Sequence, residues 1–96
     1  MIQVEDICRR FGVEELAVFG SVLRDDFEPG SDVDFMVTFK NDDAGPWMSK
    51  FTEMAEELSG VLGRRVEMVD KRGVESSENY IRRRHILSTA QIVYVA

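Results

Sequence analysis

Residues 32–39 alternate between apolar side chains and a second set that includes two acids, and this alternation constrains the fold more than any other feature of the chain. In a strand, successive side chains point to opposite faces. The two faces are therefore Val33, Phe35, Val37 and Phe39 on one side and Asp32, Asp34, Met36 and Thr38 on the other. The apolar set predicts a strand that buries one face in the core of a sheet, and the opposite face then carries both carboxylates.

The carboxylates of Asp32 and Asp34 need a compensating partner. Burying an ionised carboxylate in an apolar strand costs on the order of several kcal/mol, and two acids on one face also repel each other. A cation relieves both effects, and Mg²⁺ prefers one or two protein carboxylates completed by water and substrate phosphates. Two acids at strand spacing, about 6–7 Å apart along the chain, suit such an ion. The alternative is that Asp32 caps a turn after Ser31 and that Asp34 is an edge-strand acid that discourages aggregation.

Glu67 repeats the pattern in a second strand, predicted over residues 64–70. Its neighbours Val66 and Met68 are apolar and point to the opposite face, so Glu67 is placed to join the first two acids. Three carboxylates around two metal ions about 3.5–4 Å apart are typical of in-line phosphoryl or nucleotidyl transfer. In that arrangement Glu67 is both a metal ligand and a candidate base. The alternative is a solvated strand residue.

Hydrophobic spacing elsewhere predicts alternating helices and strands. The predicted elements are a helix over 4–11 ended by Gly12, strands over 15–20 and 32–39, a helix over 48–62, a strand over 64–70, a helix over 80–87 and a strand over 91–95. Ser76 or Ser77 is the expected N-cap of the last helix. Cys8 lies on the apolar stripe of the first helix and is expected in the core. Trp47 is expected to be buried where the long helix begins, and the alternative is that it stacks on a base.

Length and composition restrict the class of protein. Ninety-six residues fit one domain, which we place over 1–96. One cysteine cannot form an internal disulfide, and charged residues interrupt the first fifteen positions, so we expect a cytoplasmic protein without a membrane segment. A formal net charge of -6, concentrated in the first half of the chain, argues against direct nucleic-acid binding.

Gly20 and Ser21 stand where the strand over 15–20 ends. Backbone N–H groups and a serine hydroxyl are available there to an anion, because glycine permits close approach. Arg24 lies one turn further on and suits a phosphate group. The alternatives are an ordinary strand-ending turn at Gly20-Ser21, and ion pairing of Arg24 with Asp25, Asp26 or Glu28.

Three motifs together resemble the minimal nucleotidyltransferase family of the polymerase beta superfamily. They are Gly20-Ser21-Val22-Leu23-Arg24, Ser31-Asp32-Val33-Asp34-Phe35-Met36-Val37 and Val66-Glu67-Met68-Val69, and the C-terminal segment from Arg82 to Tyr94 extends the likeness nearly end to end. The resemblance implies a nucleotidyltransferase fold of the α/β class, a small mixed β-sheet with helices packed mainly on one face. It implies that Asp32, Asp34 and Glu67 bind two Mg²⁺ ions and catalyse transfer, and that Gly20 and Ser21 contact the phosphates of the nucleotide, ATP. Arg24 and Ser31 are further expected nucleotide-binding residues. Family members often have glycine where this chain has Asp25, and usually aspartate in place of Glu67.

Small members of this family resemble the antitoxin of two-gene modules whose partner is a HEPN-domain ribonuclease toxin. The resemblance implies AMP transfer from ATP to a toxin tyrosine and a hetero-oligomer with that toxin. Two alternatives remain: an antitoxin with a decayed site that neutralises its toxin by binding alone, and nucleotidyl transfer to a small hydroxyl substrate.

Arg82, Arg83, Arg84 and His85 form the basic cluster of the chain, and its usual meaning is a solvated helix face. Consecutive helical residues point in different directions, so three arginines in a row do not form one patch. The alternative is that one or two of these side chains contact the toxin or the nucleotide.

Overall fold

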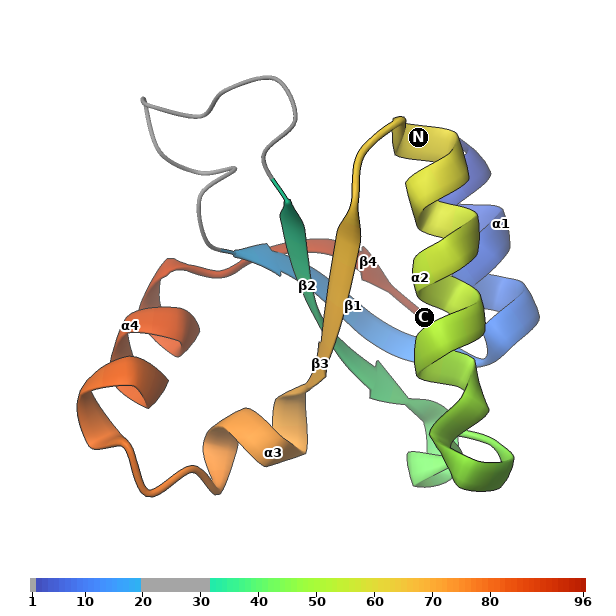
Figure 1. Cartoon of the computed structure of the whole chain (residues 1–96). Coiled ribbons are helices and arrows are strands. Elements are labelled where there is room, and N and C mark those ends of the chain that lie inside the picture. Colours follow the sequence, from blue (N-terminus) through green and yellow to red (C-terminus); the bar gives the residue numbers. More distant parts are fainter. Residues whose placement is uncertain (1, 20–31) are drawn as a thin grey trace.

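The computed structural model describes residues 2–19 and 32–96, and a four-stranded mixed sheet lies at its centre (Figure 1). The strands are β1 (Val13–Phe19), β2 (Val33–Phe39), β3 (Val66–Asp70) and β4 (Gln91–Val95). They lie in the order β3-β2-β1-β4, with β1 antiparallel to both neighbours and β2 parallel to β3. This arrangement confirms the predicted small mixed sheet.

Two helices, α1 (Ile2–Phe11) and α2 (Ser49–Leu62), cover one face of the sheet (Figure 1). Both end at a glycine with a left-handed backbone, Gly12 at φ +69° and Gly63 at φ +66°, as the helix C-cap favours. The larger core lies between these helices and the sheet, and it includes Val33, Phe35, Val37 and Phe39 of β2. The alternation in this strand therefore sorts its side chains as predicted. Each fully buried leucine contributes about 1.5–3 kcal/mol to this core.

A smaller cluster lies on the opposite face, where α4 (Tyr80–Thr89) packs on the sheet. Its buried members are Ala17, Phe19, Met36 and Ile86. Because Met36 shares its strand face with Asp34, this cluster identifies the face that carries the acids. The helical cover of that face is thinner, which agrees with helices packed mainly on one side.

The segment between β3 and α4 corrects one prediction. A short helix, α3 (Lys71–Glu75), begins directly after β3, and Ser76 lies at its C-terminal end. The N-cap of α4 is therefore Asn79, whose Oδ1 accepts a hydrogen bond from the Arg82 N–H at 3.1 Å. The prediction of Ser76 or Ser77 was wrong because the extra helix takes up the residues before them. In the described ranges, no helix combines the length and the apolar character that crossing a membrane requires.

Trp47 also corrects a prediction, since 99% of its surface is exposed. It lies in the 3-10 turn η3 (Pro46–Met48), which follows a similar turn, η2 (Lys40–Asp42), and both Trp47 and Met48 have positive φ angles. The core side of α2 begins instead at Phe51, whose ring packs edge-on against Phe39 at 5.3 Å between centroids. The expectation for Cys8 is confirmed, because its side chain is fully buried.

Candidate active site

The site is built around Asp34 and Glu67, which occupy directly opposed positions on the parallel strands β2 and β3. Neighbouring strands lie about 4.7–4.9 Å apart, so side chains at opposed positions on one face lie within contact range. The carboxyl groups of Asp34 and Glu67 share a side-chain hydrogen bond. Val66 is buried in the larger core, and Met68 packs against it, so Glu67 points to the opposite face, as its apolar neighbours indicate.

Asp32 adds a third carboxyl group at the start of β2. It directly precedes the strand and lies two residues before Asp34, and its negative charge acts on Asp34. The structure thus brings together the three acids that the sequence singles out. Gly20, Ser21, Arg24 and Ser31 lie outside the described residues.

This concentration of acids raises the pKa of Asp34 above its usual value. Loss of hydration on burial is the largest cause, followed by the negative charges of Glu67 and Asp32 and the hydrogen bond with Glu67. The positive charge of Arg82 acts in the opposite direction. Further negative charge is therefore disfavoured here, and a proton or a cation is favoured.

The donor chemistry of the three acids suits a hard cation, because every donor atom is a carboxylate oxygen. As the side chains stand, residues 2–19 and 32–96 contain no group of three or more His, Cys, Asp or Glu arranged to hold a metal ion. The site is accordingly a cluster of carboxyl groups with the right ligand type, and it is not a closed metal cage.

Arg82 lies near the acids, and the sequence analysis did not predict this position. It lies in the first turn of α4, which crosses the same face of the sheet, and its charge reaches Asp34. Arg82 is exposed, as the interpretation of the basic cluster as a solvated helix face predicts, but that interpretation did not place it near the acids. The available signal was topological, because a helix that returns the chain from β3 to the far edge of the sheet must cross one of its faces.

Arg83 has a different role from Arg82. Its guanidinium donates hydrogen bonds to the backbone carbonyls of Ser77 at 3.2 Å and Glu75 at 3.4 Å, and it lies 5.4 Å from the centre of the Tyr80 ring. These contacts fasten the segment between α3 and α4. The adjacent arginines thus point in different directions, as helical geometry requires.

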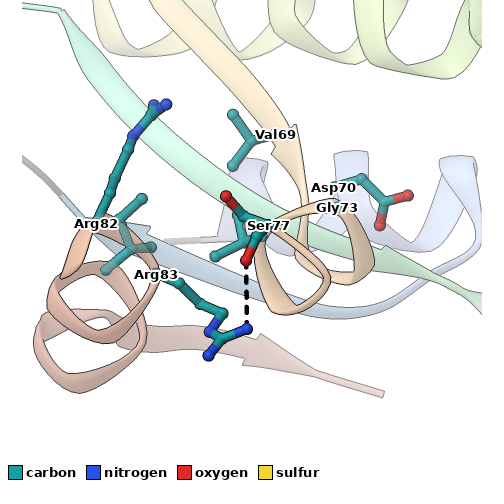
Figure 2. Close-up of a pocket in the computed structure, with 8 residues that line it drawn as sticks. Val69, Asp70, Gly73, Ser77, Arg82 and Arg83 are labelled. Carbon is teal, nitrogen blue, oxygen red and sulfur yellow. Dashed lines mark hydrogen bonds between the residues drawn. The ribbon is translucent and has the colours of Figure 1, made fainter. Parts of the chain in front are cut away.

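A pocket of about 330 Å³ lies between β3, α3 and α4 (Figure 2). Its lining residues are Val69, Asp70, Gly73, Val74, Ser77, Arg82, Arg83 and Ile86. Val69 follows Glu67 by two residues in β3 and therefore lies on the same face of the sheet. The pocket and the acid cluster are neighbours on one surface.

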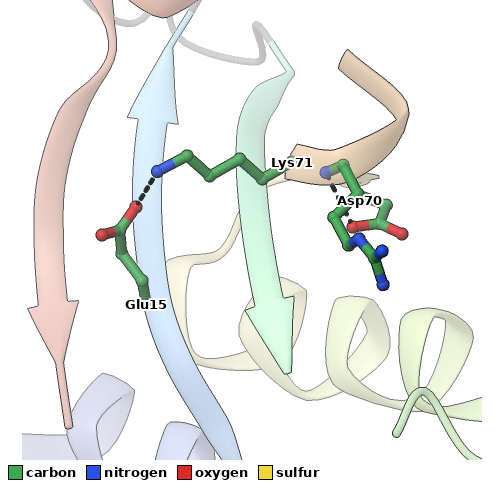
Figure 3. Close-up of polar contacts among 4 residues, drawn as sticks. Glu15, Asp70 and Lys71 are labelled. Atoms are coloured by element: carbon green, nitrogen blue, oxygen red, sulfur yellow. Dashed lines mark hydrogen bonds and ion pairs between the residues drawn. The ribbon is translucent and has the colours of Figure 1, made fainter. Parts of the chain in front are cut away.

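Polar contacts hold α3 beside this pocket (Figure 3). Lys71 Nζ donates to Glu15 Oε1 of β1 at 2.8 Å, and this hydrogen bond is the largest cause of the raised Lys71 pKa. Asp70 accepts a hydrogen bond from the Arg72 N–H at 3.1 Å and so caps the helix. Together these contacts fix the start of α3 against the sheet.

Sequence comparison places the chain among known proteins. Residues 1–92 match the family described as Nucleotidyltransferase domain. Over 72 residues the chain is 40% identical to the protein adenylyltransferase MntA of Thermococcus cleftensis, an alignment that covers 75% of this chain and 70% of the relative. A candidate protein adenylyltransferase of Methanocaldococcus jannaschii, MJ0128, is 30% identical over 82 residues, with 77% of this chain and 81% of the relative covered.

Solved structures share the fold. A candidate minimal nucleotidyltransferase superposes with a TM-score of 0.66 at 31% identity, over 92% of this chain and 83% of the other. A toxin-antitoxin structure with AMP-PNP gives a TM-score of 0.68 at 19% identity, over 99% of this chain and 73% of the other. A mutant of the toxin-antitoxin pair MntA-HpeT gives 0.67 at 17% identity, over 95% and 69%.

Proposed function

The chain belongs to the nucleotidyltransferase domain family, and from this premise we propose that it is a Mg²⁺-dependent protein adenylyltransferase that serves as the antitoxin of a toxin-antitoxin pair. The enzyme class follows from the family and from the likeness to MntA. The observation that carries the proposal is the pairing of Asp34 with Glu67 beside Asp32 on one face of the sheet.

Asp32, Asp34 and Glu67 are the proposed ligands of two Mg²⁺ ions. When bound, the ions neutralise charge on the triphosphate and on the attacking hydroxyl. The three carboxylates would orient them, and Asp34, whose ionised form is disfavoured by burial and by the neighbouring acids, would be stabilised by their charge. Gly20, Ser21, Arg24 and Ser31 are proposed to contact the nucleotide phosphates through backbone N–H groups, hydroxyls and the guanidinium.

The proposed reaction transfers AMP to a protein hydroxyl. The acceptor oxygen attacks the α-phosphorus of ATP, a new P–O bond forms, and the bond between the α-phosphorus and the bridging oxygen breaks to release pyrophosphate. Glu67 takes the proton of the acceptor hydroxyl. Misplacement of the reacting atoms by about 1 Å costs about 100-fold in rate, so the position of this carboxylate matters as much as its charge.

The proposed acceptor is a tyrosine of a HEPN-domain ribonuclease toxin, with which the chain forms a hetero-oligomer. The similarity to MntA and the shared fold with two toxin-antitoxin structures support a toxin partner. The site supports a transfer mechanism over neutralisation by contact alone, because three clustered carboxylates cost stability unless they bind a cation.

Intact mass spectrometry of the partner tests this function. The protein that copurifies with this chain from its native cell is incubated with the chain, ATP and Mg²⁺. We expect the partner to gain the mass of one or more AMP groups, and the Asp34→Asn variant to add none. Glu53→Gln, an exposed acid in α2 on the far side of the sheet, is the matched control and retains transfer. If the partner is inhibited but not modified, the result supports an antitoxin that neutralises its toxin by binding alone. If the chain modifies a small alcohol without a protein partner, the result supports nucleotidyl transfer to a small hydroxyl substrate.

A further inference from the structure

The outer edge of β4 is a strand edge that lacks protection. In the part of the chain that the structure describes, β4 pairs with β1 alone, so one side of its backbone faces away from the sheet (Figure 1). Three of its apolar side chains, those of Ile92, Val93 and Val95, are exposed. A free edge presents unpaired N–H and C=O groups and can therefore pair with another strand.

The backbone of Val95 points toward this free edge. The next residue, Ala96, donates its N–H to the carbonyl of Glu14 at 2.9 Å, and Val95 itself lies opposite Glu15 of β1. Hydrogen-bonded and non-hydrogen-bonded pairs alternate along an antiparallel ladder. Val95 therefore directs its N–H and C=O away from β1, where both groups can pair with a further strand.

Charged residues usually prevent an edge strand from pairing with another chain. The strand at the opposite edge of the sheet, β3, follows this rule, because it contains Glu67 and Asp70. Residues 86–96, by contrast, contain no Asp, Glu, Lys or Arg and form the longest such stretch of the sequence. The protective feature that β4 does have is a bulge in its pairing with β1 between Leu16 and Ala17, which adds twist but no charge.

The distribution of charge favours a second copy of the chain as the partner of this edge. Two copies that each carry a formal charge of -6 repel each other, so they meet most easily where charge is absent. About a two-fold axis a residue can also face its own counterpart, and a charged residue would then face a like charge. Among the four described strands, β4 is the one without a charged residue. A different protein that recognises an acidic chain gains most from opposite charge, which β4 does not offer.

We propose that two copies of this chain pair their β4 strands antiparallel about a two-fold axis, so that two four-stranded sheets form one continuous sheet. Ile92 and Val95 lie opposite Ala17 and Glu15 of β1, on the face where α3 and α4 pack, and in the dimer the second copy shields them from water. The acid cluster lies on β2 and β3, which β1 separates from β4, so each copy keeps its own site accessible. The dimer does not depend on the proposed function.

The mass of the full chain in solution tests the dimer. Size-exclusion chromatography with light scattering is carried out between about 1 and 100 μM, and we expect the wild type to approach twice the monomer mass as concentration rises. Ile92→Lys and Val95→Lys each bring like charges together at the interface and should weaken association by at least about tenfold. Val61→Lys is the matched control, because Val61 is an exposed apolar residue of α2, and it should leave association within about twofold of the wild type.

Hydrogen exchange of the wild type locates the interface without relying on the folding of any variant. The amide of Val95, which points away from β1, should exchange more slowly at high than at low protein concentration. The amides of β3 at the other edge should show no such dependence. Circular dichroism verifies that each lysine variant is folded, and the exchange measurement decides the matter for a variant that is not.

Three results would overturn the proposed dimer. The first is a monomer mass at every concentration, and the second is a dimer that the folded variants Ile92→Lys and Val95→Lys leave intact. The third is protection of β4 that appears only after the copurifying protein is added, because the edge then binds a different chain. All three leave the proposed function standing, since that function depends on the acid cluster.

Discussion

Asp34 and Glu67 face each other across two parallel strands and share a hydrogen bond between their carboxyl groups. Together with burial and the nearby charge of Asp32, this pairing raises the pKa of Asp34. Ionised Asp34 is therefore less stable in the folded chain than in the unfolded chain, and this penalty favours a proton or a cation at the site.

Asp34→Asn is expected to stabilise the metal-free protein at neutral pH. Because the pKa is raised, Asp34 costs the fold nothing while it is protonated and costs more as pH rises through the folded pKa. Melting curves in EDTA should show a gain for the variant that is largest near neutral pH and shrinks on acidification. A gain of about 1 kcal/mol corresponds to about 4–8 °C in a domain of this size. A variant that is less stable than the wild type at pH 7 would contradict the electrostatic account.

Glu67 variants separate the charge of this acid from its position. Glu67→Gln removes the proposed ligand and base and should reduce transfer by at least about 100-fold. Glu67→Asp keeps the charge but withdraws the carboxylate by about one bond length, so it should lose less, up to about 100-fold. Single-turnover assays with the protein acceptor measure both. Equal activity of Glu67→Gln and the wild type would show that Glu67 is not part of the active site.

Leu58→Ala tests the larger core beneath the sheet. Leu58 is fully buried, and its truncation leaves a cavity that costs about 2–5 kcal/mol. Val61→Ala on the same helix is the control, because Val61 is exposed and should change stability by less than about 0.5 kcal/mol. Urea unfolding measures the change in the free energy of unfolding for both variants. Similar unfolding midpoints for the two variants would show that Leu58 does not contribute to the core.

The thiol of Cys8 should be unreactive in the native protein. Burial, reinforced by the negative charge of Glu5, raises the thiol pKa from 9.0 to about 11. The native thiol is therefore expected to resist an aromatic disulfide reagent at pH 8 and to react at once in urea. Its contribution to stability is complete below about pH 9 and is lost as pH rises toward 11. Fast labelling under native conditions would show that α1 opens readily.

Local periodicity predicted the strands and main helices because their side chains alternate between core and surface. Val33 to Phe39 is the clearest case, since one sequence pattern specifies both the buried face and the acid face. The apolar neighbours of Glu67 predicted which face of the sheet its side chain occupies. They did not predict that Glu67 lies directly opposite Asp34, because that register arises from the pairing of β2 with β3. Register depends on contacts between distant segments.

Other features depended on tertiary context that a local pattern does not contain. Trp47 is exposed because two residues with positive φ turn the chain before α2. The short helix α3 displaced the expected cap from the serines to Asn79. Arg82 became a neighbour of the acids only through the path of α4 over the sheet, and its position was therefore not readable from the basic cluster alone.

The most direct test of the central claim is calorimetric titration of Mg²⁺ and ATP into the wild type, Asp34→Asn and Glu53→Gln. The three-acid site predicts metal-dependent nucleotide binding by the wild type and the control, and at least about tenfold weaker binding by Asp34→Asn. Nucleotide binding that is unaffected by EDTA, or that survives unchanged in Asp34→Asn, would show that the acids are not the site.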